Sequence, residues 1–340
     1  MQTILMPGVM DFNSLPKVEL HLHLDCSLSY PAAARLRPGL SLEQYRRDFV
    51  APARCQSLAH YLEAPRRMVA LLQSPAALTL AVEDVLAQLA QDRVIYAELR
   101  FAPLLHLEGG MSPEMVVGTV VEALQSATPR NGVEARLLLC TLRHFSAEQS
   151  LATLRLAQQF HGPVAGLDIA GDEAGFSLDP HVEAFVEAAR LGIPATAHAG
   201  EAAGAASLRE TWRRLRPRRI GHGVRCEEDT ALVEELNAAQ LHLEMCPTSN
   251  VQTRACGEFA DHPLPRLLAA GLSVGINTDG RAISDTELHR EYTQLCRHFG
   301  WGVREFLACN LHAIHASFAP ARVKQSVAAR LRAAWTAVQL

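Results

Sequence analysis

Short apolar stretches recur along the chain, and each is followed by a longer stretch with apolar residues at helical spacing. Apolar stretches of this length are typical of strands whose two faces are both covered by other parts of the protein. Eight of them occur, at residues 18–24, 94–102, 133–142, 164–170, 194–200, 219–224, 241–246 and 273–278. Strands that alternate with helices pair in parallel through right-handed crossovers.

The intervening stretches carry helix signals. Residues 77–91 have apolar side chains at helical spacing, and Ser41 and Ser146 are each followed three residues later by Gln, which is the capping-box pattern. Ser112-Pro113 also predicts a helix start. Residues 25–93 are too many for one helix and predict several helices near the barrel mouth. The sequence therefore predicts an α/β fold, a (β/α)₈ TIM barrel with extra helices capping the mouth after strand 1.

Composition adds limits to this interpretation. The chain has 340 residues, 49% of them hydrophobic and 20% charged, which is ordinary for a globular protein. No linker, low-complexity segment or repeat interrupts it, so we expect residues 1–340 to form a single domain with barrel strands from about residue 18 to 280. The net charge of −4 provides no basic field for nucleic acid, so we expect a small-molecule partner.

The sequence predicts neither a membrane anchor nor an export signal. It contains no run of 18 apolar residues, and residues 1–12 lack a charged start followed by an apolar run. The eight cysteines are scattered without a Cys-x-x-Cys pair, which is typical of reduced thiols. We therefore expect a cytoplasmic protein, and the sequence does not indicate its oligomeric state.

Three features of the sequence are interpreted as structural. Glu98 and Arg100 predict an ion pair near the barrel wall, and Cys246 predicts a buried thiol without a catalytic role. An arginine cluster predicts a solvated helix end and loop rather than an anion site. Its members are Arg209, Arg213, Arg214, Arg216, Arg218 and Arg219.

Polar residues stand where four of the predicted strands end, and functional groups of α/β barrels gather at these carboxyl ends. The first strand carries His21 and His23, which share a face because strand side chains alternate. Alone, this pair suits a hydrogen-bonded core pair as well as a metal site.

The later strand ends carry His198, Glu201, His222 and Asp279. Each alone could be a satisfied polar residue at a strand end. Together, imidazoles and carboxylates at one mouth would be costly to bury without a cation. Three histidines and one carboxylate that leave a position open for water are typical of a catalytic zinc site.

Missing motifs narrow the kind of metal centre. A metal pair bridged by a carboxylated lysine is excluded, because the chain has only Lys17 and Lys324 and neither ends the fourth strand. The His-Glu-x-x-His motif of zinc proteases and the Pro-Cys-x-x-Cys signature of cytidine-type deaminases are also absent. We therefore expect one metal ion per chain.

Six short segments together resemble the adenosine deaminase family, in order and in spacing. They are PKVELHLHLD at 16–25, LDIAGDE at 167–173, TAHAGE at 196–201, RIGHG at 219–223, EMCPTSN at 244–250 and NTD at 277–279. The similarity runs from about Asp11 to the region of Ala316, which is nearly the whole chain. Independent motifs in one order make a chance resemblance implausible.

The resemblance implies a zinc hydrolase and assigns roles to residues. One Zn²⁺ would be held by His21, His23, His198 and Asp279. The metal lowers the pKa of its water, His222 and Asp279 would orient that water and take its proton, and Glu201 would protonate purine N1. A desolvated pocket must raise the pKa of Glu201 for this.

The resemblance also implies the substrate contacts. His23, Asp25, Gly171 and position 280 would bind substrate. Asp25 would accept a hydrogen bond from the ribose 5′-hydroxyl, and Gly171 would donate its backbone N–H to purine N3. Gly280 stands where the family usually has Asp or Asn contacting N7, and Cys26 stands where it usually has glycine. Residues 61–65 lack the paired phenylalanines of the animal enzymes' lid.

The expected reaction is hydrolytic deamination of adenosine or 2′-deoxyadenosine to inosine or 2′-deoxyinosine and ammonia, in purine salvage. Another 6-aminopurine is the alternative, namely 6-aminodeoxyfutalosine of menaquinone synthesis or adenine. A single-metal amidase or phosphoesterase does not explain the placement of Glu201 three residues after His198. A metal-stabilised binding protein without turnover is the non-enzymatic alternative.

Overall fold

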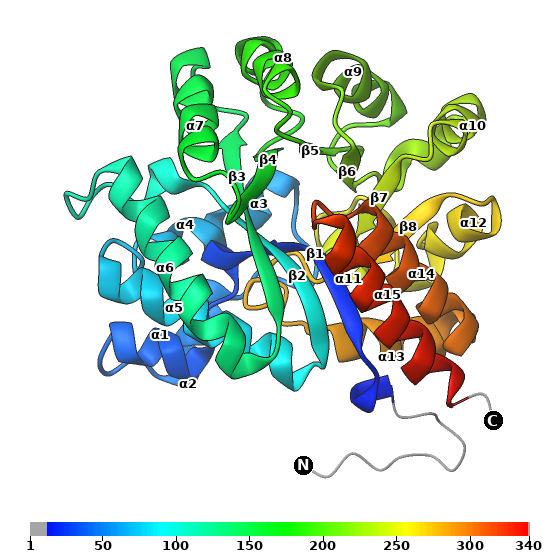
Figure 1. Ribbon diagram of the computed structural model, residues 1–340, viewed down its shortest axis with the longest axis horizontal. Coiled ribbons are helices and arrows are strands. Elements are labelled where there is room, and N and C mark those ends of the chain that lie inside the picture. Colours follow the sequence, from blue (N-terminus) through cyan, green and yellow to red (C-terminus); the bar gives the residue numbers. More distant parts are fainter. Residues whose placement is uncertain (1–11, 339–340) are drawn as a thin grey trace.

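The computed structural model describes residues 12–338, and within them eight strands lie at the centre of the molecule (Figure 1). They are β1 (Lys17–His23), β2 (Val94–Phe101), β3 (Glu134–Leu142), β4 (Val164–Ala170), β5 (Thr196–Ala199), β6 (Arg219–His222), β7 (His242–Met245) and β8 (Ser273–Ile276). They pair in parallel and in sequence order as β1–β4 and β5–β8. All eight predicted strands are confirmed. The expectation about the N-terminal segment falls mostly on residues 1–11, which lie outside the described residues.

Parallel bridges join the two sets of strands on both sides. Between β4 and β5, Leu167 pairs with Ala195, and its N–H donates to the Pro194 carbonyl over 3.0 Å. Between β1 and the end of β8, Leu22 pairs with Asp279; the Asp279 N–H donates to the His21 carbonyl over 3.0 Å. The predicted parallel barrel is therefore confirmed, with β1 and β8 as neighbours.

Helices surround the strands and link them (Figure 1). The longer ones are α5 (Pro75–Gln91), α6 (Pro113–Asn131), α7 (Ala147–Gln159), α8 (Val182–Arg190), α9 (Ala205–Leu215), α10 (Thr230–Ala238), α13 (Leu288–Phe299), α14 (Val303–Ala316) and α15 (Ala321–Thr336). The shorter ones are α1 (Tyr30–Leu36), α2 (Leu42–Phe49), α3 (Leu58–Tyr61), α4 (Glu63–Val69), α11 (Pro247–Gln252) and α12 (Leu264–Ala269). The 3₁₀ turns are η1 (Phe12–Ser14), η2 (Leu24–Cys26), η3 (Pro103–Leu105), η4 (Asp179–His181), η5 (Val224–Glu228) and η6 (Phe259–Asp261). Several helices thus fill residues 25–93, as predicted.

Local sequence explains where several helices begin. Ser41 and Ser146 form complete capping boxes with the Gln three residues later, at the starts of α2 and α7. The hydroxyl of Ser112 accepts the N–H of Met115, and Pro113 occupies the first position of α6, where a missing N–H costs nothing. The predicted helix starts are confirmed.

The strands that carry functional residues end earlier than predicted. β5, β6, β7 and β8 have four residues each, and the chain turns sharply after them. Gly200 follows β5, His222 is the last residue of β6 and Asp279 follows β8; their φ values of 69°, 62° and 63° are left-handed backbone, through which a strand does not continue. The left-handed conformation is rare for residues other than glycine and costs energy, so the fold must hold His222 and Asp279 in place.

The barrel interior holds buried charges that pair across it. This interior ion network consists of Glu98, Arg100, Asp168, Arg219 and Glu244, all with 0% exposure. The predicted ion pair between Glu98 and Arg100 is wrong. Both side chains point into the barrel from β2, but each pairs with charged residues of other strands. Arg100 contacts Asp168 and Glu244 over 2.8 and 2.7 Å, and Glu98 contacts Arg219 over 2.6 Å.

The arginine cluster divides into two groups. Arg209 contacts Asp229 and Arg214 contacts Glu210, both over 2.6 Å, so these side chains are neutralised at the surface as expected. Arg219 is an exception, because its position on β6 turns its side chain into the barrel.

Within residues 12–338, no helix combines the length and apolarity that crossing a membrane requires.

We predict that Arg219→Met destabilises the protein by about 3–5 kcal/mol, because Glu98 and Glu244 would remain buried without their shared cation. Urea denaturation measures this. Arg190→Met, which breaks an exposed pair with Glu187, is the control and should leave the midpoint unchanged. Equal midpoint shifts in the two variants would contradict the assigned role of the network.

Candidate metal centre

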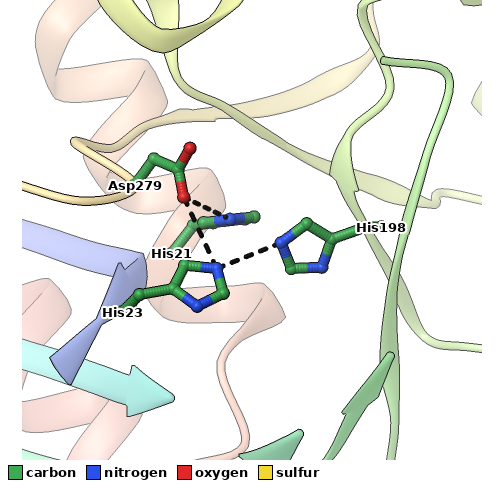
Figure 2. Close-up of side chains that lie close together, drawn as sticks. All are labelled: His21, His23, His198 and Asp279. Carbon is green, nitrogen blue, oxygen red and sulfur yellow. Dashed lines mark hydrogen bonds and ion pairs between the residues drawn. The ribbon is translucent and has the colours of Figure 1, made fainter. Parts of the chain in front are cut away.

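Four predicted ligand residues meet at the carboxyl end of the barrel (Figure 2). His21, His23, His198 and Asp279 each offer one atom, and these four atoms lie within 4.8 Å of one another. The Nε2 atoms of His23 and His198 are 3.1 Å apart. The Asp279 Oδ1 atom lies 3.4 Å from His23 Nε2 and 3.5 Å from His21 Nε2.

Strand geometry and one glycine create room for this cluster. His21 and His23 are alternate residues of β1 and point the same way, and the bridge between β1 and the β8 end brings Asp279 beside them. Gly221 on β6 leaves space for the rings: a Cβ there would lie 2.9 Å from His21 Cε1 and 3.3 Å from His198 Cγ. Any larger residue at position 221 would displace the imidazoles.

Carboxylates fix the orientation of two imidazoles. His21 Nδ1 contacts Glu244 over 3.0 Å, and His198 Nδ1 contacts Asp168 over 3.1 Å. Because each carboxylate accepts the Nδ1 proton, the Nε2 lone pair of each ring points into the cluster. Glu244 stays ionised: burial alone would raise its pKa, but Arg100 and Arg219 hold that pKa well below its usual value.

The cluster fits a divalent cation. His21 Nε2 is fully buried and has no hydrogen-bond partner. Its lone pair and that of His198 Nε2 point into the same small space, because the Nδ1 atoms of both rings face carboxylates. Oxygen from Asp279 completes the donor set, and the Ser249 hydroxyl orients this carboxylate by donating to Oδ2 over 2.7 Å. These donors form a metal-binding group.

Glu201 lies beside the cluster and is almost fully buried. Its Oε2 atom is 3.4 Å from His222 Nε2, and its Oε1 atom has no hydrogen-bond partner. Burial, followed by the charge of Asp279, raises the pKa of Glu201 well above its usual value. The environment therefore favours the protonated carboxyl group, and Oε1 is free to meet a ligand in the cavity.

A second carboxylate braces the loop that carries Glu201. Glu173 accepts the backbone N–H groups of Gly200, Glu201 and Ala203 over 2.8, 3.0 and 3.0 Å. It also accepts the Ser207 hydroxyl over 2.7 Å. One side chain thus satisfies three backbone donors within four residues of a tight turn, so we assign Glu173 a positioning role that sequence reasoning missed.

His222 is held by an amide whose orientation is fixed. Asn250 Oδ1 accepts the Cys246 N–H over 3.2 Å and contacts His262 Nε2 over 3.2 Å, so its Nδ2 faces His222 Nδ1 over 3.0 Å. Because Nδ1 accepts, the proton of the neutral ring sits on Nε2, toward Glu201. Burial lowers the pKa of His222 well below its usual value, which keeps the ring neutral.

A cavity of about 470 Å³ opens above the cluster, within the range of small-molecule sites. His23, His198, His222, Glu201 and Asp279 line its inner end. Residues of α3 and α4, among them Leu58, Leu62 and Pro65, line its outer part, so these helices lie at the mouth as predicted.

The predicted substrate contacts lie around this cavity, with one exception. Asp25 and Gly171 line it, and Gly171 has φ of 98°, which only glycine adopts readily. The Asp25 carboxylate accepts the Ala102 N–H over 3.3 Å. Gly280 is not among the lining residues; Cys26 is.

The partners that orient the histidines were not predicted from sequence. Asp168 and Glu244 lie inside motif segments, but their contacts cross from β4 to β5 and from β7 to β1. Only their positions could have indicated this role, because each is a carboxylate on a barrel strand at a place where side-chain alternation turns it inward.

Cys246 is buried as expected, and its thiol contacts the Glu244 carbonyl.

Known proteins of one family resemble this chain along nearly its whole length. The sequence pattern of the family described as adenosine deaminase matches residues 16–334. An adenosine deaminase of Clostridium acetobutylicum is 33% identical over 325 residues, which cover 94% of this chain and 97% of that protein. An adenosine deaminase of Lacticaseibacillus casei is 36% identical over 332 residues, with 95% and 98% covered.

Solved structures have the same fold. The adenine deaminase from Arthrobacter aurescens matches with a TM-score of 0.87 and 31% identity, over 95% of this chain and all of that one (100%). The N6-methyl-AMP deaminase from Arabidopsis thaliana matches with a TM-score of 0.84 and 25% identity, over 95% and 98% of the two chains. The names of these two proteins state different purine substrates.

We predict that Asp168→Asn weakens divalent-ion binding about 10–100-fold, because an amide cannot accept the His198 Nδ1 proton as strongly as a carboxylate does. Competition of the purified protein with a chromophoric chelator measures the affinity. Asp172→Asn is the control, since Asp172 lines the same cavity but its carboxylate accepts the N–H groups of Ala174 and Gly175. Unchanged affinity in Asp168→Asn would contradict this positioning role.

Proposed function

The chain belongs to the adenosine deaminase family of hydrolases, and from this membership and the site geometry we propose that it deaminates adenosine and 2′-deoxyadenosine. The products would be inosine or 2′-deoxyinosine and ammonia, in purine salvage. One observation carries the proposal: His23, His198 and Asp279 of the metal-binding group line one cavity together with Glu201 and His222. With a metal ion bound, that arrangement would present a water molecule, an acid and a hydrogen-bond donor to a single reacting carbon.

We propose that the metal is Zn²⁺, one per chain, held by His21, His23, His198 and Asp279. Three imidazoles and a carboxylate suit zinc better than magnesium or calcium, which prefer oxygen ligands. When bound, zinc supplies Lewis-acid activation of a water molecule at neutral pH. The partners of His21 and His198 support this assignment because they point each Nε2 lone pair into the cluster.

Glu201 serves as the acid in this proposal. Its raised pKa favours the protonated carboxyl group, and its free Oε1 is available to a ligand. Protonation of purine N1 withdraws electrons from C6 and makes that carbon open to attack by water. The Glu173 brace holds the donor in place, so little reorganisation is required during the reaction.

We propose that His222 and Asp279 divide the handling of the water. His222 carries its proton on Nε2 because Asn250 donates to Nδ1, so it orients the water by donating a hydrogen bond. The Asp279 carboxylate, which the Ser249 hydroxyl orients through Oδ2, accepts a proton of the water in this proposal. That proton then passes to the departing amino group, which leaves as ammonia. The remaining proton of the C6 hydroxyl returns to Glu201 as the C6 carbonyl forms, which restores the acid.

The rest of the cavity suits a nucleoside. Asp25 accepts a hydrogen bond from the ribose 5′-hydroxyl in this proposal, since its carboxylate lines the cavity and has a single backbone donor, Ala102, within 3.5 Å. The left-handed backbone of Gly171 lets purine N3 approach the chain closely. His23 faces the same space and bounds the purine on the metal side.

Adenine is the second candidate substrate. The observation in its favour is the 31% identity with the adenine deaminase of Arthrobacter aurescens over 95% of this chain. Free adenine would leave Asp25 and the apolar surface of α3 and α4 without a partner, whereas a ribose would fill this outer part of the cavity. We therefore place adenosine first and treat 6-aminodeoxyfutalosine as a further compound to assay.

A comparison of substrates tests the proposal. We expect kcat/KM for adenosine and 2′-deoxyadenosine to exceed that for adenine and 6-aminodeoxyfutalosine by at least tenfold, measured from the purine absorbance change. Activity should vanish after removal of metal by a chelator and return with Zn²⁺. A preference for adenine would replace the proposed substrate, and release of ammonia from none of these compounds would refute the deaminase assignment.

The acid role predicts a pH dependence. The protonated form of Glu201 is the active one and its pKa is raised, so kcat/KM should hold at low pH and fall as pH rises through that pKa. Glu201→Gln should lower kcat/KM about 10²–10⁴-fold and abolish this alkaline limb, with metal content unchanged. Glu183→Gln, on the surface of α8, should behave like the unsubstituted protein. An unaltered limb in Glu201→Gln would assign the acid elsewhere.

A further inference from the structure

The glycine at position 280 is required by space rather than by backbone conformation. Gly280 does not have a left-handed φ, so its backbone tolerates any L residue. A Cβ built there would lie 2.8 Å from Cys26 Cβ and 3.2 Å from the Cys26 carbonyl oxygen. Real Cβ atoms do not approach another carbon so closely. The two sequence departures at 26 and 280 are therefore one structural feature.

Hydrogen bonds prevent the two loops from separating. The N–H groups of Ala282 and Ile283 both donate to the Cys26 carbonyl, over 3.2 and 3.3 Å. The Arg281 N–H donates to the Ser27 hydroxyl over 3.1 Å. The loop after β1 and the loop after β8 thus have a fixed spacing, and the side chain of Cys26 occupies the space that a side chain at position 280 would need.

Cys26 presents its side chain to the cavity. Its Sγ donates to Asp25 Oδ1 over 3.8 Å, and this thiol, a ring nitrogen of His23 and a carboxylate oxygen of Asp25 all lie within 4.8 Å of one another. Cys26 lines the cavity, together with Asp279, whereas Gly280 does not. Cys26 follows β1 and Glu201 follows β5, and these strands are four apart in the ring of eight, so the two side chains belong to opposite walls.

The proposed reaction fixes which edge of a purine meets each wall. N1 and C5 flank C6 in the ring, so a purine with C6 at the metal group and N1 at Glu201 turns its C5–N7 edge toward the opposite wall. We propose that Cys26 is a specificity-determining residue whose thiol contacts purine N7, with Gly280 as the residue that makes room for it. This inference rests on the proposed function. A thiol is a weak hydrogen-bond donor, and N7 is an acceptor.

The contact with N7 is tested with 7-deazaadenosine, in which CH replaces N7. We expect Cys26→Ala to lower kcat/KM for adenosine about three- to tenfold and to change the kinetic constant for 7-deazaadenosine less than twofold, whether it acts as substrate or competitive inhibitor. Cys256→Ala, which removes a partly buried thiol outside the cavity, is the control. Equal losses on both compounds would overturn the N7 contact.

The packing relation is tested by a set of variants at the two positions. Gly280→Ala should lower the Tm by about 2–10 °C and reduce kcat/KM for adenosine, because its Cβ meets that of Cys26. Adding Cys26→Gly should restore the Tm, whereas adding Cys26→Ala should not, since alanine keeps the clashing Cβ. Gly302→Ala, where a Cβ meets nothing within 4 Å, is the control.

The outcomes separate this inference from the proposed function. If the unsubstituted protein does not deaminate adenosine, the proposed function fails. If it does, and Cys26→Gly fails to rescue Gly280→Ala, the matched pair is wrong. Rescue of the Tm together with equal losses on adenosine and 7-deazaadenosine would leave a packing pair and overturn the specificity role.

Discussion

The orientation of the histidines at the barrel mouth depends on two carboxylates that are fully buried. Asp168 and Glu244 each hold one imidazole by its Nδ1 atom, and the Arg100 side chain joins them over 2.8 and 2.7 Å. Without Arg100, two buried negative charges would face one another beneath the metal group. The interior ion network is therefore less a source of stability than a means of keeping the Nε2 lone pairs directed at one point.

The fold could be predicted from sequence because its signals are local. Apolar runs of strand length, capping serines and Pro113 are each read from a few neighbouring residues, and the structure confirms the elements that they predict. The metal-binding group could also be predicted, because side chains alternate along β1 and functional groups of α/β barrels gather at the carboxyl ends of the strands. The predicted strands extend too far at their carboxyl ends, because the sequence has no local signal for the left-handed backbone at His222 and Asp279.

The remaining features depend on contacts between residues far apart in the chain. The partner of Glu98 is Arg219, more than a hundred positions away, and adjacency on β2 suggested Arg100 instead. The brace formed by Glu173 acts on a loop after the next strand. Nothing in the spacing of these residues distinguishes them from ordinary polar positions. The meaning of Gly280 likewise emerges only when Cys26 is seen against it.

The seam between β1 and β8 has a consequence for how the protein assembles. It joins the first strand to the last, and the backbone N–H of Asp279, a member of the metal-binding group, donates to the His21 carbonyl across that seam. A growing chain therefore possesses two histidines early and lacks a complete ligand set until its last strand is made. Tight binding of a metal ion should therefore indicate that the barrel has closed. A bound ion in turn stabilises the closed barrel relative to partly opened forms.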